Sequence, residues 1–292
     1  MVAAFKYVLQ LLDQQLTFLL LGPTNLSGEM GTYLHELFNF AERILIDVAK
    51  PIAYTILALF FVLEIYRLSI RAEASGGGSG QLGVELIIKV LFRLVIFKVV
   101  IDKTPEIMKA IYNLTAYLTS KIAATSFSAS SPPQIIDVDA VANHLSSVFP
   151  LNFLQIIVSI VMALLIYLVV LFATAIAYIV SYLRLIELYL YYALSPIPLA
   201  TLPSEELSSA GKSFLKSFTA VSLQGSIIFL IMMFLPAIAN NVFVGIGGAS
   251  GLPIVDANKL SLAYLFIICW AVILMMALLQ ARQFANNLCQ AI

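Results

Sequence analysis

Residues 151–183 read LNFLQIIVSIVMALLIYLVVLFATAIAYIVSYL, and none of them carries a charge. About 20 consecutive apolar residues are enough for a helix to cross the hydrocarbon layer of a bilayer. This stretch therefore predicts a transmembrane helix. The whole chain has the same character, with 61% apolar and 11% charged residues. Soluble domains have about 45–50% apolar and about 25% charged residues, so the sequence predicts an integral membrane protein.

Other stretches on both sides of this one also have the length and composition of spans. They lie at 48–68, 84–101, 217–244 and 260–281. Together with 151–183 they predict an all-α polytopic membrane protein with about five transmembrane helices. Between the first two spans, 75–80 reads SGGGSG, a flexible stretch that fits either a natural loop or an engineered linker.

Amphipathic helices are expected beside these spans, because apolar residues recur there at helical spacing. They occupy 2–21, 32–49, 107–122 and, after a loop at 126–133, residues 139–149. Such helices lie in the membrane interface or pack on a neighbour. We therefore divide the chain into N-terminal amphipathic helices (1–49), the first two spans (50–102), an external amphipathic region (103–150) and a three-span core (151–292).

Proline interrupts one apolar segment of the three-span core. Residues 189–200 read YLYYALSPIPLA. Proline removes a helical hydrogen bond, and irregular backbone at membrane depth is tolerated only where it is buried in protein or lines a cavity. We therefore predict one re-entrant segment over 185–203, with Ser195, Pro196 and Pro198 as candidates for a channel or subunit interface.

The second predicted span carries charges that lipid disfavours. Lys89, Arg93 and Lys98 all lie within 84–101. A single charge at the bilayer centre costs roughly 2.5–3.5 kcal/mol on insertion scales. One interpretation is that these cations line an aqueous path, bind an anionic substrate or face another subunit.

A structural interpretation of the same cations is also open. Nearby carboxylates could neutralise them, and long side chains near the ends of a span can reach the interface. The pairs that this interpretation predicts are Glu85 with Lys89, Lys98 with Asp102, and Arg93 with Glu64 or Glu187. Glu64 and Glu187 are themselves candidates for a channel or subunit interface, and each also has an arginine three residues away, Arg67 and Arg184 respectively.

Basic residues in short connections favour one orientation. The connections 67–83 and 184–216 carry five arginines and lysines, two plus three, against one in 245–259. Short loops rich in Lys and Arg stay in the cytoplasm. We therefore expect the N-terminus outside and the C-terminus in the cytoplasm.

No motif predicts catalysis or a bound cofactor. The two histidines, His35 and His144, are far apart, and a metal site needs convergent ligands. Gly211-Lys212-Ser213 resembles the end of a phosphate-binding loop, but that pattern needs a glycine five residues earlier, where Glu206 stands. We expect no catalytic residue, no metal and no cofactor. The net charge of zero does not predict a polyanionic partner.

The sequence around the interrupted segment resembles the TrbL family, the polytopic inner-membrane proteins of type IV secretion and conjugation machines. Two further stretches resemble the version found on mobile elements of Gram-positive bacteria, and the resemblance covers about 40–290. The pieces that resemble the family as a whole are RLIELYLYYALSPIPLAT at 184–201, KSFLK at 212–216 and Gln224-Gly225. The pieces that resemble the Gram-positive version are 51–67 and 85–102.

This resemblance implies a non-enzymatic channel subunit with five core spans in the bacterial plasma membrane, which helps DNA or protein to cross. The implied partners are other secretion-channel subunits, secretion ATPases and the transferred DNA or protein, besides the lipid bilayer, and we expect a homo-oligomer. Residues 104–150 would be external and 184–216 cytoplasmic. Two alternatives remain open: a secondary transporter or channel for a small solute, and an assembly scaffold without a pore.

Overall fold

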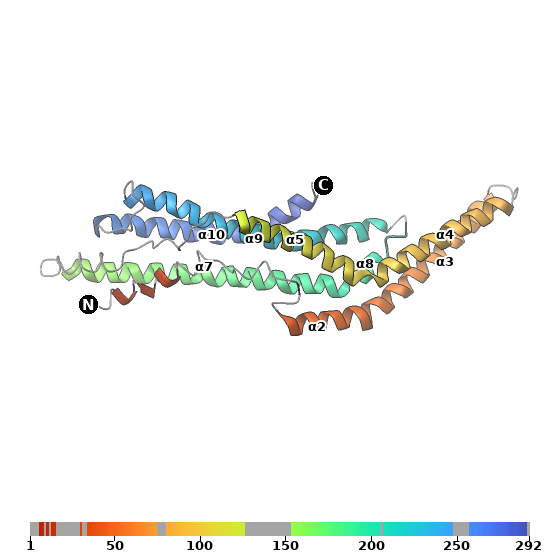
Figure 1. The fold of residues 1–292 in the computed structure, drawn as a ribbon, viewed down its shortest axis with the longest axis horizontal. Coiled ribbons are helices and arrows are strands. Elements are labelled where there is room, and N and C mark those ends of the chain that lie inside the picture. Colours follow the sequence, from red (N-terminus) through yellow and green to blue (C-terminus); the bar gives the residue numbers. More distant parts are fainter. Residues whose placement is uncertain are drawn as a thin grey trace. The chain divides into compact units, whose positions relative to one another are not determined.

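The structure is a computed structural model, and all regular elements in its described residues are helices (Figure 1). It describes 6–8, 10–11, 13–15, 30, 34–74, 80–125, 153–204, 207–247 and 257–290. These residues form two compact units. The first unit comprises 1–27, 118–183 and 224–284, and the second comprises 28–117, 184–223 and 285–292.

Several of the helices are long. In chain order they are α2 (His35–Ile44), the π-helix η2 (Leu45–Ala49), α3 (Lys50–Ala74), α4 (Gly80–Asp102), α5 (Thr104–Thr125), α7 (Phe153–Leu194), α8 (Pro196–Leu199), α9 (Ser208–Gly247) and α10 (Ala257–Gln290). Four described segments are long and apolar enough to cross a membrane: His35–Ile70, Ile160–Leu194, Ser208–Phe234 and Leu265–Cys289.

These segments confirm an all-α polytopic membrane protein and overlap four of the five predicted spans. The remaining predicted span, 84–101, is helical throughout as part of α4. It is not one of the four segments, and its row of charged residues sets it apart from them. The crossing of the membrane by α4 therefore stays a prediction.

The first crossing helix begins earlier than the sequence suggested, because α2, η2 and α3 run on without a break. The expected amphipathic helix at 32–49 is thus continuous with the first span. Pro51 in a regular α-helix would clash with the carbonyl four residues before it. The π-helical turn Leu45–Ala49 ends two residues before this proline, and its wider i→i+5 spacing gives the ring room.

The same wide turn keeps one face of the helix buried. Ala41, Leu45, Ala49, Ala53 and Leu57 are all buried and follow one another at intervals of four. Four residues of a regular α-helix advance by about 400°, so such a row drifts by about 40° at each step. A π-turn has more residues per turn and rotates less per residue, which brings the row back toward its starting face.

The proline-interrupted region is shorter than predicted. Helix α7 continues through 185–194, which were assigned to the re-entrant segment, and ends at Leu194. The first residue that breaks a helix is Pro196, so nothing before it ends α7. Only the short helix α8 and the turns around it, 195–204, are irregular. The re-entry of 185–203 into the membrane stays a prediction.

Of the other predicted elements, some are helical in the structure and some lie outside the described residues. Helix α5 confirms a helix over 107–122. The described residues within 2–21 are helical. The loop at 126–133, the helix at 139–149 and most of the stretch 75–80 lie outside the described residues.

The core of the first unit is apolar and rich in alanine. Ala163 and Ala173 of α7 and Ala271 of α10 are buried there with Ile228 of α9. Small residues let helices approach closely in a membrane, where packing rather than the hydrophobic effect holds helices together. The outward face of α7 in this unit presents large apolar side chains such as Leu168 and Phe172, as lipid contact requires.

The core of the second unit contains aromatic residues from four helices. Phe38 of α2, Tyr112 of α5, Tyr189 and Tyr192 of α7 and Phe218 of α9 are all buried in it. The Tyr189 hydroxyl donates a hydrogen bond of 2.7 Å to the Met30 carbonyl. Both of these tyrosines of α7 are therefore core residues of the second unit.

Candidate functional site

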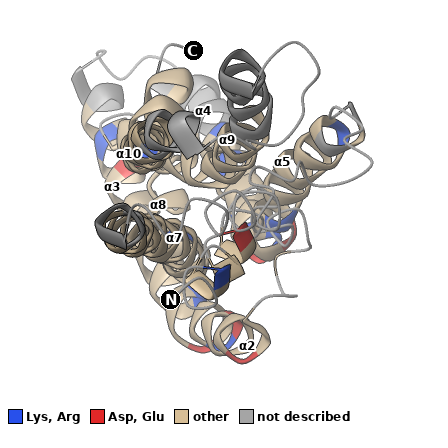
Figure 2. Cartoon of the chain, turned by 90° about the vertical axis from the view of Figure 1, so that its left-hand side faces the viewer, with Lys and Arg blue, Asp and Glu red and all other residues tan. Residues whose placement is uncertain are grey.

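The α3–α4 hairpin brings charged residues of two helices together. Both helices belong to the second unit and lie side by side (Figure 1). Charged residues are sparse along the described helices (Figure 2), so those that share one location stand out. Glu64 and Arg67 come from α3, and Arg93 comes from α4.

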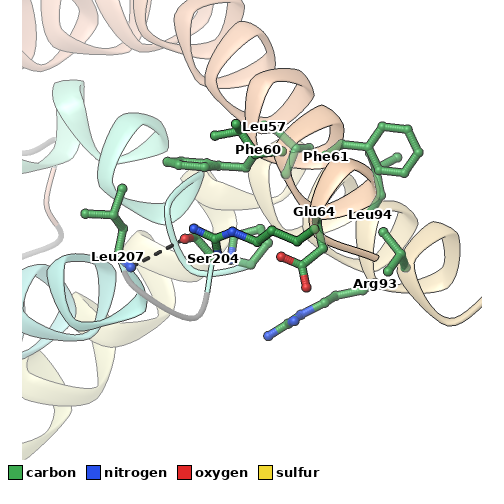
Figure 3. A pocket seen from close by; sticks show the side chains of 12 residues that line it. Leu57, Phe60, Phe61, Glu64, Arg93, Leu94, Ser204 and Leu207 are labelled. Carbon is green, nitrogen blue, oxygen red and sulfur yellow. Dashed lines mark hydrogen bonds between the residues drawn. The ribbon is translucent and has the colours of Figure 1, made fainter. Parts of the chain in front are cut away.

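These three residues line one cavity of about 130 Å³. Figure 3 shows Glu64 and Arg93 reaching into the same space from neighbouring helices. The turn after α8 closes the cavity on another side. The remaining lining residues are Leu57, Phe60, Phe61, Leu63, Val90, Leu94, Pro203, Ser204 and Leu207.

Arg93 thus shares a cavity with Glu64, one of the two carboxylates that the structural interpretation offered it. The structure records no ion pair between Arg93 and any described carboxylate, and Glu187 is not part of this lining. Among the described lining residues, the charged groups are two guanidinium groups and one carboxylate.

The other two cations of α4 point away from the protein interior. Lys89 and Lys98 are exposed, and neither makes an ion pair within the described part of the chain. The side chain of Glu85, the expected partner of Lys89, lies outside the described residues. The Asp102 carboxylate, the expected partner of Lys98, instead accepts a hydrogen bond from the Tyr54 hydroxyl of α3.

Asp102 marks the corner where α4 ends and α5 begins, and α3 holds this corner. The Lys50 ammonium donates a 3.1 Å hydrogen bond to the Asp102 backbone carbonyl. One residue on, the Lys103 ammonium is 2.7 Å from Glu106, and this hydrogen bond raises the pKa of Lys103. The corner fixes the direction in which α4 presents its cations.

The proline segment is buried rather than cavity-lining. Ser195 and Pro196 are buried and Pro198 is partly buried. The Ser195 hydroxyl donates a 2.7 Å hydrogen bond to the Tyr192 carbonyl, one of those that the end of α7 leaves unsatisfied. In the turn that follows α8, Pro203 and Ser204 line the cavity instead. The role of Ser195, Pro196 and Pro198 in a channel or subunit interface stays a prediction.

An ion pair inside the second unit was not anticipated from the sequence. The Lys109 ammonium of α5 lies 2.9 Å from Glu42 of α2. It also lies 5.2 Å from the ring centre of Phe38 and 6.0 Å from that of Tyr192. The contact joins residues 67 positions apart, so helical periodicity alone could not indicate it.

We expect this pair to contribute modestly to stability. Lys109 and Glu42 are 40% and 33% exposed, so the ion pair is worth about 1 kcal/mol or less, with about 0.5–1 kcal/mol more from the aromatic rings. In a double-mutant cycle of Lys109→Met and Glu42→Gln, measured by thermal unfolding in detergent, the two changes should not be additive.

The matched control is the exposed pair Lys103–Glu106, whose side chains are 58% and 68% exposed. Its cycle should give a smaller coupling energy, because solvent screens exposed charges. Additive effects of Lys109→Met and Glu42→Gln would show that the contact does not stabilise the second unit.

A second unanticipated contact ties α7 to α9. Arg184 is 3% exposed. Its Nε donates to the Val221 carbonyl at 3.2 Å, and its Nη2 donates to the Ser222 carbonyl at 3.1 Å. The sequence offered Glu187 as the partner of Arg184, and only the fold brings the α9 carbonyls within reach.

The described residues contain no group of three His, Cys, Asp or Glu side chains that could hold a metal ion. The site therefore consists of cations, one carboxylate and apolar walls. Two guanidinium groups beside apolar walls are chemically suited to an anionic group or to a packing partner.

Comparison with known proteins identifies the family. The family described as TrbL/VirB6 plasmid conjugal transfer like protein matches residues 27–196. No curated protein and no solved structure matches the chain. The match covers more than half of the sequence, including α2 to α7 and the cavity residues that α3 and α4 contribute. The chain therefore belongs to the TrbL/VirB6 plasmid conjugal transfer like family and is a membrane component of conjugal transfer by type IV secretion.

Proposed function

We propose that the chain is a channel or scaffold subunit that helps DNA or protein to cross the plasma membrane during conjugal transfer. The observation that carries this proposal is the pair of exposed cations on α4, Lys89 and Lys98. Each would cost roughly 2.5–3.5 kcal/mol if it faced lipid at the bilayer centre. A second subunit or a polyanionic substrate in an aqueous path removes this cost.

The family and the fold support this proposal. Four crossing segments with large apolar outer faces suit a subunit that is embedded in the membrane. The chain carries no phosphate-binding loop at Gly211, so partner ATPases would supply the energy. With the N-terminus outside, 184–216 face the cytoplasm, where substrate and ATPases arrive. The subunits would assemble with other secretion proteins and with copies of this chain.

A small-solute transporter is the main rival. Many transporters contain two repeats with discontinuous helices in matching positions. The described part of the chain has one such interruption, at 195–204, and the sequence shows no matching second one. A pore-less scaffold is the other rival, and it predicts stable co-purification with partners but no cross-links to the substrate.

The first test is a mating assay with a donor that lacks the gene, with and without the gene on a separate plasmid. Transfer should disappear in the deletion strain and return on complementation. Unchanged transfer, together with altered uptake or export of a small solute, would replace the proposal with the transporter.

A second test addresses the cations directly. The double variant Lys89→Gln/Lys98→Gln should lower the transfer frequency by about tenfold, equivalent to about 1.4 kcal/mol at the affected step, while the protein level stays constant. The matched control is Lys89→Arg/Lys98→Arg, which keeps both charges and should transfer normally. Equal transfer by the glutamine variant and the wild type would exclude a role for these cations.

A further inference from the structure

The cavity between α3 and α4 has two kinds of wall. Arg67, Arg93, Glu64 and Ser204 supply polar groups, and the other eight lining residues are apolar. The Ser204 hydroxyl oxygen accepts a hydrogen bond from the Leu207 amide at 3.4 Å (Figure 3). A molecule that matches both walls must itself have a charged end and an apolar end.

The charge of the cavity selects the charged end. The described lining residues carry two guanidinium groups and one carboxylate. Arginine forms strong, directional hydrogen bonds with phosphate. A phosphodiester carries one negative charge that suits Arg67 and Arg93, whereas a zwitterionic headgroup adds a further cation beside them.

The position of the cavity selects a membrane ligand. Glu64 and Arg67 lie in the last turns of the first crossing segment, which ends at Ile70. The residues on the opposite wall, Ser204 and Leu207, belong to 184–216. The basic connections 67–83 and 184–216 are both predicted to be cytoplasmic, so the two walls meet at the same predicted face of the membrane. Arg93 lies within the predicted span 84–101, and a long side chain in a span can reach toward the headgroups.

The apolar wall continues onto the outer surface of the hairpin. Leu63 of α3 lines the cavity and is also 44% exposed. Large apolar side chains are exposed beside it on both helices, namely Val62, Ile65, Ile88, Leu91 and Phe92. An acyl chain leaving the cavity would therefore find a continuous apolar surface.

We propose that this cavity binds one acidic phospholipid, with its phosphate between Arg93 and Arg67 and its acyl chains along the apolar side of α3 and α4. Basic pockets between membrane helices on the cytoplasmic side commonly take acidic headgroups. Single-stranded nucleic acid needs an extended basic groove with stacking platforms, and a cavity of about 130 Å³ is too small for that. The bound lipid would fill the space between the hairpin and the turn 203–207.

The test is native mass spectrometry of the full-length protein, purified in mild detergent and mixed with equal amounts of phosphatidylglycerol and phosphatidylcholine. The wild type should retain phosphatidylglycerol preferentially. Arg93→Gln should reduce this retention by about fivefold, the effect of losing one cation at an anionic headgroup. Lys98→Gln, which removes an exposed cation of the same helix outside the cavity, should leave it unchanged.

Two further measurements separate lipid binding from misfolding and from binding of free phosphate. Arg93→Lys keeps the charge and should restore most of the retention, which separates lost binding from misfolding. Inorganic phosphate in millimolar excess should not displace the lipid, because it lacks the apolar end. Equal retention of both lipids, displacement by phosphate, or equal retention by Arg93→Gln and the wild type would each overturn the proposal. The measurement uses purified protein, so it stands apart from the mating assays.

Discussion

Replacing Arg184 by alanine should lower the stability of the folded protein by about 3 kcal/mol or more, because two hydrogen bonds from a charged group are lost and each contributes roughly 1.5–3 kcal/mol. The donors and acceptors are buried, and the arginine is 3% exposed. Truncation also leaves a cavity between α7 and α9, which adds to the cost. A typical domain is stable by only about 5–15 kcal/mol.

The measurement is the midpoint of thermal unfolding in detergent, together with the yield of monodisperse protein. Arg184→Lys keeps the charge but loses the planar fork that reaches two carbonyls, so it should fall between the wild type and Arg184→Ala. The control Lys212→Ala removes an exposed cation from α9, and its midpoint of thermal unfolding should equal that of the wild type. An unchanged midpoint for Arg184→Ala would show that the contact with α9 does not hold the helices together.

The second large effect is expected at Gly211 near the start of α9. A β-carbon at this position would lie 2.7 Å from Leu202 Cγ and Cδ2 and 2.8 Å from the Pro198 carbonyl oxygen. That carbonyl cannot move freely, because it accepts hydrogen bonds from the amide and the hydroxyl of Thr201, at 3.2 Å and 2.8 Å. A side chain at 211 therefore pushes α9 away from α8.

For valine at 211, the cost of overpacking exceeds the gain in helix propensity. Alanine is better than glycine in a helix by about 0.8–1.0 kcal/mol, while overpacking costs typically 1–3 kcal/mol. Gly211→Ala should therefore be mildly destabilising, and Gly211→Val, which adds two more carbon atoms and a β-branch, should destabilise by about 3 kcal/mol. Thermal unfolding and transfer frequency should both fall.

The matched control is Ala210→Val, which adds the same kind of side chain one residue earlier, where the position is exposed. It should change the unfolding midpoint little. If Gly211→Val and Ala210→Val behaved alike, the close approach of α9 to Pro198 would not limit the residue at 211.

Sequence reasoning found the membrane class and most of the helices because these depend on long apolar runs and proline positions. The charge-free stretch 151–183 became α7. The end of that helix was misplaced because Arg184 and Glu187 were read as the end of the span, although charges do not stop a helix. Pro196 does, and α7 ends directly before Ser195.

The candidate site was only partly accessible from the sequence. Arg93 and Glu64 could be named as neighbours because both stand out against apolar helices. Pro203 and Ser204 could not, because the turn that carries them is brought to the cavity by tertiary packing. Gly211 is a second example: the sequence excluded a phosphate loop at Gly211-Lys212-Ser213 but gave no reason for the glycine, which the structure explains by the close approach of Pro198.

The π-turn at Leu45–Ala49 makes the first crossing helix sensitive to the number of its residues. The π-turn absorbs one more residue than a regular turn holds, so deleting one residue there would let it relax into a regular α-helix with its two ends still in phase. Deleting a residue elsewhere in this helix would rotate everything before it by about 100° about the axis, and Phe38 and Ala41 would then leave the aromatic core. Changes of length are therefore tolerated only at the π-turn or in the connecting loops.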